Sequence, residues 1–512
     1  MDSIIALINT KTKLIKSKHN FKSQPKLDEL EALYSIHPDK SDDEICKLLY
    51  GSITKKKSFS VIKYRLLDRL ITEVIMASGD ESNLTSVSYA VQIAIKYYYS
   101  AAILLKNGER TSAINLLEKC LTIALKFSLT EYVVISLKIL LNHYAFINVD
   151  KNKMNHYIRL RQKHLEIYQQ EAIVLEYNAR MSYLYVTKSG GFNDAELLDI
   201  KNMVYHLEVI KNTYTSNTIL THSYDLIFFY YNYLKSYEKA LETANEALRV
   251  YKKMKVKELF GTYQMQNNIA TVYFNMKEYD NANIWFEKQF AFLSVGSVPW
   301  FRTTSIYFLN LMYIKDYKKL IEISSQVLAN KNLNKLTTFS EQWYIREAFI
   351  HLLIHVYSDQ FKLIEPHKLK PFSSSKFMNN ITFHSKDKQG QNISILVVQF
   401  LHLLALGNYE IIFDKVDALK QYTFRYLRND NTFRSNCFIK MLLEMVRADF
   451  NPIRTERYTA TLLQRLVESD IIIDDKNSRV EIIPYEDLWE IAMEILRQNM
   501  IKQNKENKKI KK

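Results

Sequence analysis

The chain has 512 residues with only 9 glycines and 7 prolines, well below the usual shares of about 7% and 5%. So few turn formers argue against β-sandwiches, barrels and doubly wound sheets, and they predict an all-α protein. The formal charge of +15 is compatible with a nucleic-acid or acidic membrane surface. The joint abundance of Lys, Asn, Ile and Tyr is also what an AT-rich coding sequence produces, so the charge alone does not favour a nucleic-acid partner.

The cysteines and the apolar segments bear on location. Cys46, Cys120 and Cys437 stand alone, without a CxxC spacing, which argues against disulfides and structural zinc. The longest mostly apolar run, Ile393–Leu406, has 14 residues, whereas a membrane span needs about 20. The acidic N-terminal start does not resemble a signal peptide. We therefore expect a cytoplasmic protein with no membrane span, no metal and no cofactor.

The N-terminal part of the chain predicts a flexible lead over residues 1–24 and a helical capping bundle over residues 25–80. Ser41 and Glu44 have the spacing of a capping box at the start of a helix. The last helix of this bundle carries Lys63, Arg65 and Arg69, so a DNA-binding helix-turn-helix is the alternative. However, the connection Gly51–Phe59 is longer than the usual turn of about 3–4 residues, which favours the capping bundle.

Residues 87–360 read as nearly continuous helical hairpins, and three related copies lie between Tyr224 and Val327. One residue at the start of each second helix serves as a reference position, and these residues are spaced 42 and 38 apart: Ala240, Ala282 and Leu320. An aromatic residue precedes each by three positions: Tyr237, Tyr279 and Tyr317. Tyr231 and Tyr273 precede the first two by nine positions. Gly108 and Gly407 mark weaker copies and suit a left-handed helix end.

The middle copy is the clearest, with packing residues at Ile269, Ala270, Tyr273, Tyr279, Ala282 and Phe286. In these residues the chain resembles the tetratricopeptide repeat (TPR) family, a helical-hairpin α-solenoid with a period of about 34 residues. The resemblance implies a peptide-binding groove on the first helix of each hairpin. By position, its residues are Asp225, Phe229, Tyr233, Gln264, Asn267, Thr271, Asn275, Arg302, Ser305, Leu309 and Tyr313. Members that clamp a C-terminal carboxylate use lysines where Gln264 and Asn267 stand, so this partner class is not expected.

The C-terminal third begins with a loop-like stretch. Pro366, Pro371 and Gly390 predict a linker or loop excursion over residues 361–392. Further helical repeats and a cap are expected over residues 393–500, with a possible short β-hairpin flanking Asp474–Ser478. Residues 501–512 are basic and are expected to be disordered.

No catalytic motif stands out in the sequence. His351 and His355 share a helical face and could bind a metal, but Leu352 occupies the place of the metalloprotease glutamate, so packing histidines are favoured. We expect a non-enzymatic interaction scaffold that binds a protein or peptide in its concave groove. The alternative is a peptide- or partner-sensing regulator whose basic terminal bundle binds nucleic acid through Lys55, Lys56, Lys57 and Arg65; this partner is possible but not favoured.

Overall fold

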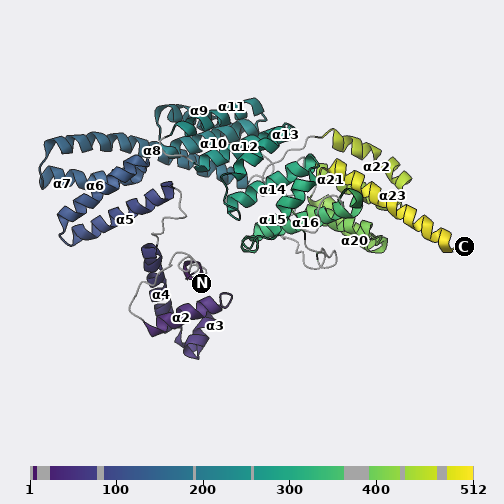
Figure 1. The fold of residues 1–512 in the computed structure, drawn as a ribbon, viewed down its shortest axis with the longest axis horizontal. Coiled ribbons are helices and arrows are strands. Elements are labelled where there is room, and N and C mark those ends of the chain that lie inside the picture. Colours follow the sequence, from purple (N-terminus) through teal and green to yellow (C-terminus); the bar gives the residue numbers. More distant parts are fainter. Residues whose placement is uncertain are drawn as a thin grey trace. The chain divides into compact units, whose positions relative to one another are not determined.

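The computed structural model describes residues 4–8, 24–77, 86–187, 192–254, 259–361, 369, 377, 391–426, 433–469 and 481–510. Within these residues the fold is all-α, contains no strand, and packs its helices in adjacent pairs as a solenoid of helical hairpins (Figure 1). The chain divides into two compact units at Gln169 and Gln170. None of the described helices is long and apolar enough to span a lipid bilayer.

Unit 1 begins with a small helical bundle. Its helices are α2 (Pro25–Ile36), α3 (Asp42–Tyr50), the 3-10 turn η1 (Ile53–Lys55) and α4 (Lys56–Ala77). Ser41 and Glu44 form the predicted capping box, in which each side chain bonds to the backbone of the other residue. Ile4 and Ile8 are helical and buried in this core, so these residues of the predicted flexible lead belong to the bundle, because their apolar side chains complete it.

The rest of unit 1 is built from longer helices. These are α5 (Ser86–Lys106), α6 (Arg110–Lys126), α7 (Thr130–Phe146) and the first part of α8 (Lys151–Thr187). Their shared core contains Ala113, Leu117, Leu137 and Leu140, all fully buried. Ala113 is the fourth residue of α6, the helix that follows Gly108, so the weaker repeat copy marked by this glycine buries a small residue near the start of its second helix.

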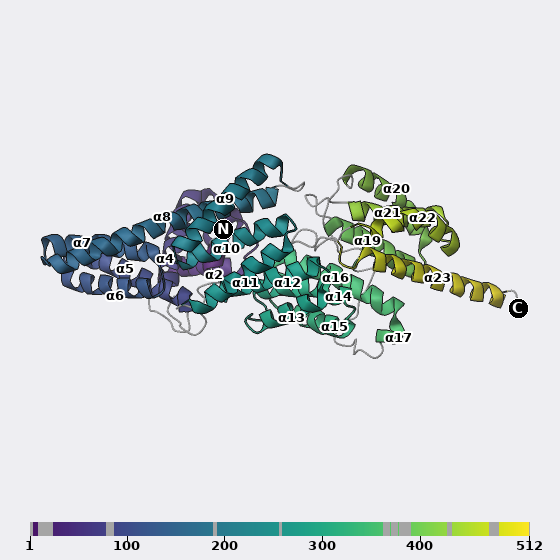
Figure 2. The same cartoon turned by 90° about the horizontal axis from the view of Figure 1, so that it is seen from above.

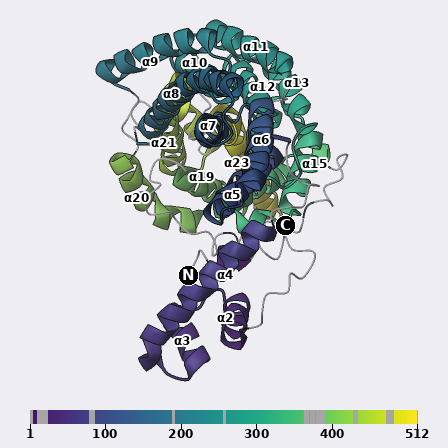
Figure 3. The ribbon, with the colours of Figure 1, turned by 90° about the vertical axis from the view of Figure 1, so that its left-hand side faces the viewer.

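Unit 2 contains the three clear repeat copies. The rest of α8 is followed by α9 (Asp194–Thr213). The copies then form the hairpins α10 (Asn217–Tyr233) with α11 (Tyr237–Lys253), α12 (Leu259–Asn275) with α13 (Tyr279–Phe290), and α14 (Val298–Tyr313) with α15 (Tyr317–Leu328). Figure 3 shows α9, α10, α11, α13 and α15 following one another around an arc. We call these three pairs the first, second and third hairpins.

The three hairpins share one turn. Lys235, Lys277 and Lys315 all have left-handed backbones, with φ of 56°, 64° and 57°, and each stands two residues before the second helix. The amide that follows each lysine bonds five residues back, as from Glu278 N to Tyr273 O at 2.9 Å. This is the pattern of a Schellman motif. Gly108 and Gly407, at φ of 84° and 72°, make the same turn and confirm the left-handed helix ends expected there.

The predicted packing residues occupy equivalent places in the hairpins. Ala240, Ala282 and Leu320 are each the fourth residue of a second helix and are fully buried. Ile269, Ala270 and Phe286 are fully buried as well. The predicted tyrosines are half-buried and pack against the hydrophobic cores of the hairpins: Tyr231, Tyr237, Tyr273, Tyr279 and Tyr317. The predicted recurrence of packing positions is therefore present in the fold.

The C-terminal part of unit 2 continues the helical packing (Figure 2). The 3-10 turn η3 (Leu333–Lys335) leads into α16 (Thr337–Val356) and the short α17 (Ser358–Phe361). After these come α19 (Gln391–Ala405), α20 (Tyr409–Tyr426), α21 (Phe433–Arg447), α22 (Pro452–Val467) and α23 (Tyr485–Ile510). One continuous core runs from the second hairpin to α23. The apolar run at Ile393 is the buried helix α19, as expected.

Several predicted segments lie largely outside the described residues. These include most of the linker at 361–392, of which Leu369 and Phe377 are buried, and most of the possible β-hairpin. Its described part, residues 481–484, is not a strand. The basic tail differs from expectation, because α23 continues to Ile510. The sequence from Tyr485 onward has no Gly or Pro, and lysines near a helix C-terminus interact favourably with its dipole.

Candidate binding surface

The first helices of the first two hairpins present a half-buried polar stripe. On α12 the stripe consists of Gln264, Asn268, Thr271 and Asn275, which are spaced by four, three and four residues and are all half-buried. This spacing places them on one side of the helix. Asn267 was predicted for this face but is only 4% exposed. It lies one residue out of register with the stripe, so Asn268 takes its place on the surface.

The stripe of α10 meets that of α12 through a hydrogen bond. His222, Asp225 and Phe229 are half-buried on α10, and Asn268 Nδ2 donates to Asp225 Oδ1 at 3.2 Å. Burial raises the pKa of Asp225, while the Asn268 hydrogen bond and the charges of His222 and Arg302 act in the opposite direction. Polar groups from three successive first helices, α10, α12 and α14, thus converge around one carboxylate.

The end of the α10 stripe is occupied by aromatic side chains of the same unit. Phe229 makes an edge contact with Tyr185, with ring centres 5.5 Å apart, and Tyr233 lies 4.5 Å from Phe192. The backbone N of Phe192 donates to the hydroxyl of Tyr233 at 2.8 Å. Phe229 is half-buried and Tyr233 is 37% exposed, so these two aromatic side chains form one end of the stripe.

The third hairpin carries the corresponding residues and buries two of them, whereas Arg302 and Tyr313 are half-buried. Ser305 is 7% exposed and Leu309 is fully buried, although both follow the spacing predicted for a groove. Arg346 of α16 donates to Ser305 Oγ at 3.0 Å, and its guanidinium lies over the rings of Phe308 and Trp343 at 5.4 and 5.1 Å. Helix α16 thus covers the inner side of α14.

Tyr313, the last predicted groove residue, belongs to an aromatic contact between hairpins. Its ring lies 5.3 Å from that of Tyr279 and 4.8 Å from that of Phe274. Burial raises the pKa of the Tyr313 hydroxyl well above its usual range, and the negative charge of Glu481 adds to the shift. This end of the third hairpin therefore faces the C-terminal helices rather than an open groove.

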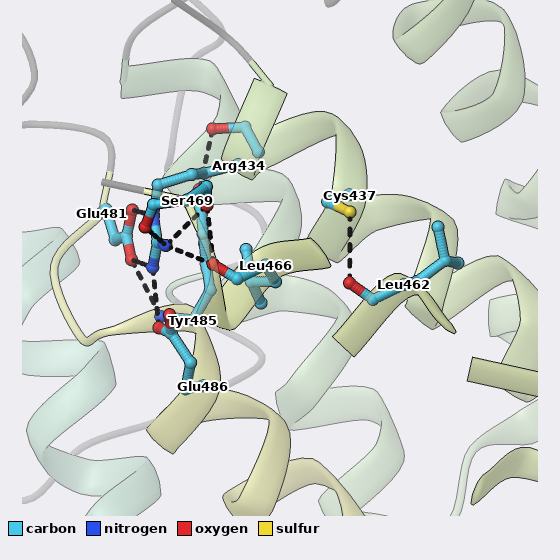
Figure 4. A network of polar contacts seen from close by, with 9 residues as sticks. Arg434, Cys437, Leu462, Leu466, Ser469, Glu481, Tyr485 and Glu486 are labelled. Atoms are coloured by element: carbon cyan, nitrogen blue, oxygen red, sulfur yellow. Dashed lines mark hydrogen bonds and ion pairs between the residues drawn. The ribbon is translucent and has the colours of Figure 1, made fainter. Parts of the chain in front are cut away.

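A buried network around Arg434 holds these C-terminal helices together (Figure 4). Arg434 of α21 binds both carboxylate oxygens of Glu481, through Nη2 at 2.7 Å and Nε at 2.9 Å, and binds Glu486 of α23 at 2.7 Å. Its Nη1 donates to the carbonyl of Leu466 at 2.8 Å. Burial alone would lower the pKa of Arg434, but the two carboxylates outweigh this effect and raise it. The network joins α21, the end of α22 and the start of α23.

The histidines considered for a metal site are separated by their surroundings. His355 is exposed, whereas His351 is half-buried, and burial lowers the pKa of His351 to about 4. The ring of His402 on α19 lies 3.0 Å from the carbonyl oxygen of Ala348. Among the described residues, no group of three or more His, Cys, Asp or Glu side chains could hold a metal ion.

A second candidate surface is a cleft of about 440 Å³ along α22 and the start of α23. Its walls include Leu463, Val467 and Trp489, with Glu456 and Glu468 beside them. Both acids are engaged: Glu456 pairs with Arg497 at 2.5 Å, and Glu468 accepts from Gln464 at 2.9 Å. The carboxylates that line this cleft therefore serve local contacts, which does not favour acid–base chemistry there.

Comparison with known proteins adds no family to this description. Neither a scan against models of protein families nor a search of curated proteins finds a match to the chain. The residues that sequence reasoning missed are Asn268, Arg346, Arg434 and Glu481. Asn267 and Asn268 both fit helical spacing from Gln264, so spacing alone does not choose between them, and the other three act through contacts between distant segments.

Proposed function

We propose that the chain is a non-enzymatic, cytoplasmic scaffold of the TPR type that binds a protein or peptide along the inner side of its first two hairpins. The observation that carries this proposal is the half-buried stripe Gln264, Asn268, Thr271 and Asn275 on α12. Amide and hydroxyl side chains both donate and accept hydrogen bonds, which matches the backbone of an extended peptide. The Schellman turns and buried reference residues of the hairpins support the TPR assignment.

The dimensions of the stripe define the ligand. From Gln264 to Asn275 the helix rises about 16 Å at about 1.5 Å per residue. An extended peptide advances about 3.3 Å per residue, so about five peptide residues would lie along α12. Asp225 and Asn268 form the polar centre of this surface, and the aromatic pair Phe229 and Tyr233 closes one end of it.

A library of random short peptides displayed on phage tests this function. Full-length protein should enrich a family of related peptides, and synthetic versions should bind in solution. Thr271→Arg places a long side chain across the stripe without removing the Asp225–Asn268 bond, and we expect it to weaken binding by about tenfold or more, which is about 1.4 kcal/mol. Gln326→Ala changes an exposed residue on α15 and should bind as the wild type does.

Two outcomes would contradict the proposal. One is that Thr271→Arg retains the peptides with unchanged affinity, which would place binding elsewhere. The other is that no peptide family is enriched while the purified protein turns over a small-molecule substrate. A melting temperature of Thr271→Arg close to that of the wild type shows that a loss of binding is not a loss of folding.

A further inference from the structure

In the N-terminal bundle some Lys and Arg side chains form ion pairs with Asp or Glu, and others do not. Residues 24–77 contain nine Lys or Arg and nine Asp or Glu, so the bundle has no net charge. Arg69 pairs with Asp28 at 2.6 Å and with Glu31 at 2.5 Å. Lys63 pairs with Asp42, and Lys56 pairs with Asp43. Arg69 also lies 3.6 Å from Glu73, and Glu44 is held in the capping box. Six of the nine acids are thus engaged, and the cations that do not pair with them form a separate set on the surface.

Four lysines of this remaining set lie at the junction of α2, α3 and α4. The Nζ atoms of Lys26 and Lys55 lie 5.4 and 5.7 Å from the centre of the Tyr50 ring. Lys47 precedes Tyr50 by three residues on α3, and Lys57 is the second residue of α4. All four are exposed, and no ion pair engages them among the described residues.

The connection between α3 and α4 is shorter than the sequence suggests. Helix α4 begins at Lys56 rather than near Phe59, so five residues, Gly51 to Lys55, join it to α3. Gly51 has a left-handed backbone with φ of 70° and caps α3. This length is close to the turn of a helix-turn-helix, which often contains glycine. The connection thus exceeds the usual turn by about one residue, whereas the length expected from the sequence exceeded it by about five.

Beside the lysines, the exposed side of α4 carries side chains that can contact nucleic-acid bases. Lys57, Val61 and Tyr64 are spaced by four and three residues, so they share one side of the helix. Val61 is 53% and Tyr64 is 72% exposed, and Arg65 is exposed beside them. An aromatic ring left in water among cations suits stacking on a nucleobase or packing against a sugar.

We propose that this basic surface, formed by Lys26, Lys47, Lys55, Lys57, Tyr64 and Arg65, binds nucleic acid. The lysines neutralise backbone phosphates, and Tyr64 contacts bases or sugars. Neutralised phosphates release counterions, so affinity depends on salt through the number of lysines engaged. This function is separate from peptide binding on α12, since it uses other residues in the other compact unit.

Fluorescence anisotropy with full-length protein tests the surface on duplex DNA, single-stranded DNA and RNA of mixed sequence, from about 50 to 200 mM salt. The double variant Lys55→Gln/Lys57→Gln should reduce the slope of log affinity against log salt by about 2 on duplex DNA. Tyr64→Ala should lower affinity several-fold and leave the slope unchanged. Lys318→Gln/Lys335→Gln removes the same charge from exposed lysines elsewhere and should change neither quantity.

Three results would overturn the inference. The first is that no nucleic acid binds even at the lowest salt. The second is that the control double variant reduces the slope as much as Lys55→Gln/Lys57→Gln does. The third is that polyglutamate displaces bound nucleic acid as effectively as unlabelled nucleic acid does, which would assign the surface to an acidic protein partner. Thermal melting of each variant establishes that it is folded.

Discussion

The second and third hairpins are built alike but differ in what covers them. Both turn through a left-handed lysine, Lys277 or Lys315, and both bury a reference residue, Ala282 or Leu320. The inner side of α12 keeps a half-buried polar stripe, whereas on the same side of α14 Ser305 and Leu309 are buried and α16 contacts Ser305. The repeat pattern therefore specifies the hairpin, and contacts from distant segments decide whether its inner side can bind a ligand.

One of the two largest expected effects comes from removing the cation that holds the C-terminal helices together. Arg434→Ala leaves Glu481, which is 12% exposed, and Glu486, which is 27% exposed, without their partner, which should cost about 3 kcal/mol of unfolding free energy. Urea denaturation followed by circular dichroism measures the loss. Because these helices pack against the third hairpin, hydrogen exchange should increase in α14 more than in α12.

Arg447→Ala provides the matched control on the same helix. Arg447 is 75% exposed and pairs with Glu444 of α21 at 3.3 Å. An exposed pair of this kind contributes about 0–1 kcal/mol. Equal destabilisation by the two substitutions would show that the contacts of Arg434 with Glu481 and Glu486 do not stabilise the C-terminal helices.

The next effect concerns the reference position, which holds a small residue in the second hairpin and a large one in the third. Leu320→Ala should leave a cavity and cost about 2–5 kcal/mol. Ala282→Leu should overpack the equivalent site and cost about 1–3 kcal/mol. Urea midpoints of both variants test the comparison. If either substitution leaves the urea midpoint unchanged, the two helices of that hairpin do not pack tightly around the reference residue.

The hairpins were predictable because their signals are local. Ala240, Ala282 and Leu320 stand a constant three residues after a tyrosine, since the packing residue and the turn belong to one short segment. On α12 one of the four predicted positions, Asn267, is buried. Asn267 and Asn268 both fit helical spacing from Gln264, so only the packing of the neighbouring elements separates the two. Arg434 and Glu481 are 47 residues apart, and no local period signals such a pair. The closed inner side of the third hairpin could not be predicted for the same reason.

The packing of α16 against the third hairpin should also depend on pH. Burial, together with the nearby charge of His402, lowers the pKa of His351 on α16 to about 4, whereas an unfolded histidine titrates near 6.5. The unfolded chain thus binds this proton at a higher pH than the folded chain does. The stability contributed by neutral His351 is fully present above about pH 6.5 and is lost as the pH falls toward 4.

Urea midpoints at about pH 7 and pH 5 measure this dependence, because the two values lie on either side of the unfolded titration. His351→Gln should lose less stability on acidification than the wild type, since glutamine does not titrate. His156→Gln removes an exposed histidine of α8 and should keep the wild-type response. The assignment to His351 fails if both variants respond to pH alike.

The smallest expected effect tests the turn that the hairpins share. Lys277 adopts φ of 64°, where a side chain costs about 1–2 kcal/mol relative to glycine. Lys277→Gly should therefore stabilise the protein by about 1 kcal/mol or less after the entropy of glycine in the unfolded chain is subtracted. Gly407→Ala makes the opposite change at φ of 72°, where nothing lies within 4 Å of the added methyl group, so its cost should be backbone strain alone. Opposite shifts of the urea midpoint would show that the turns are equivalent. Shifts of the same sign would show that the left-handed conformation is not what these two positions share.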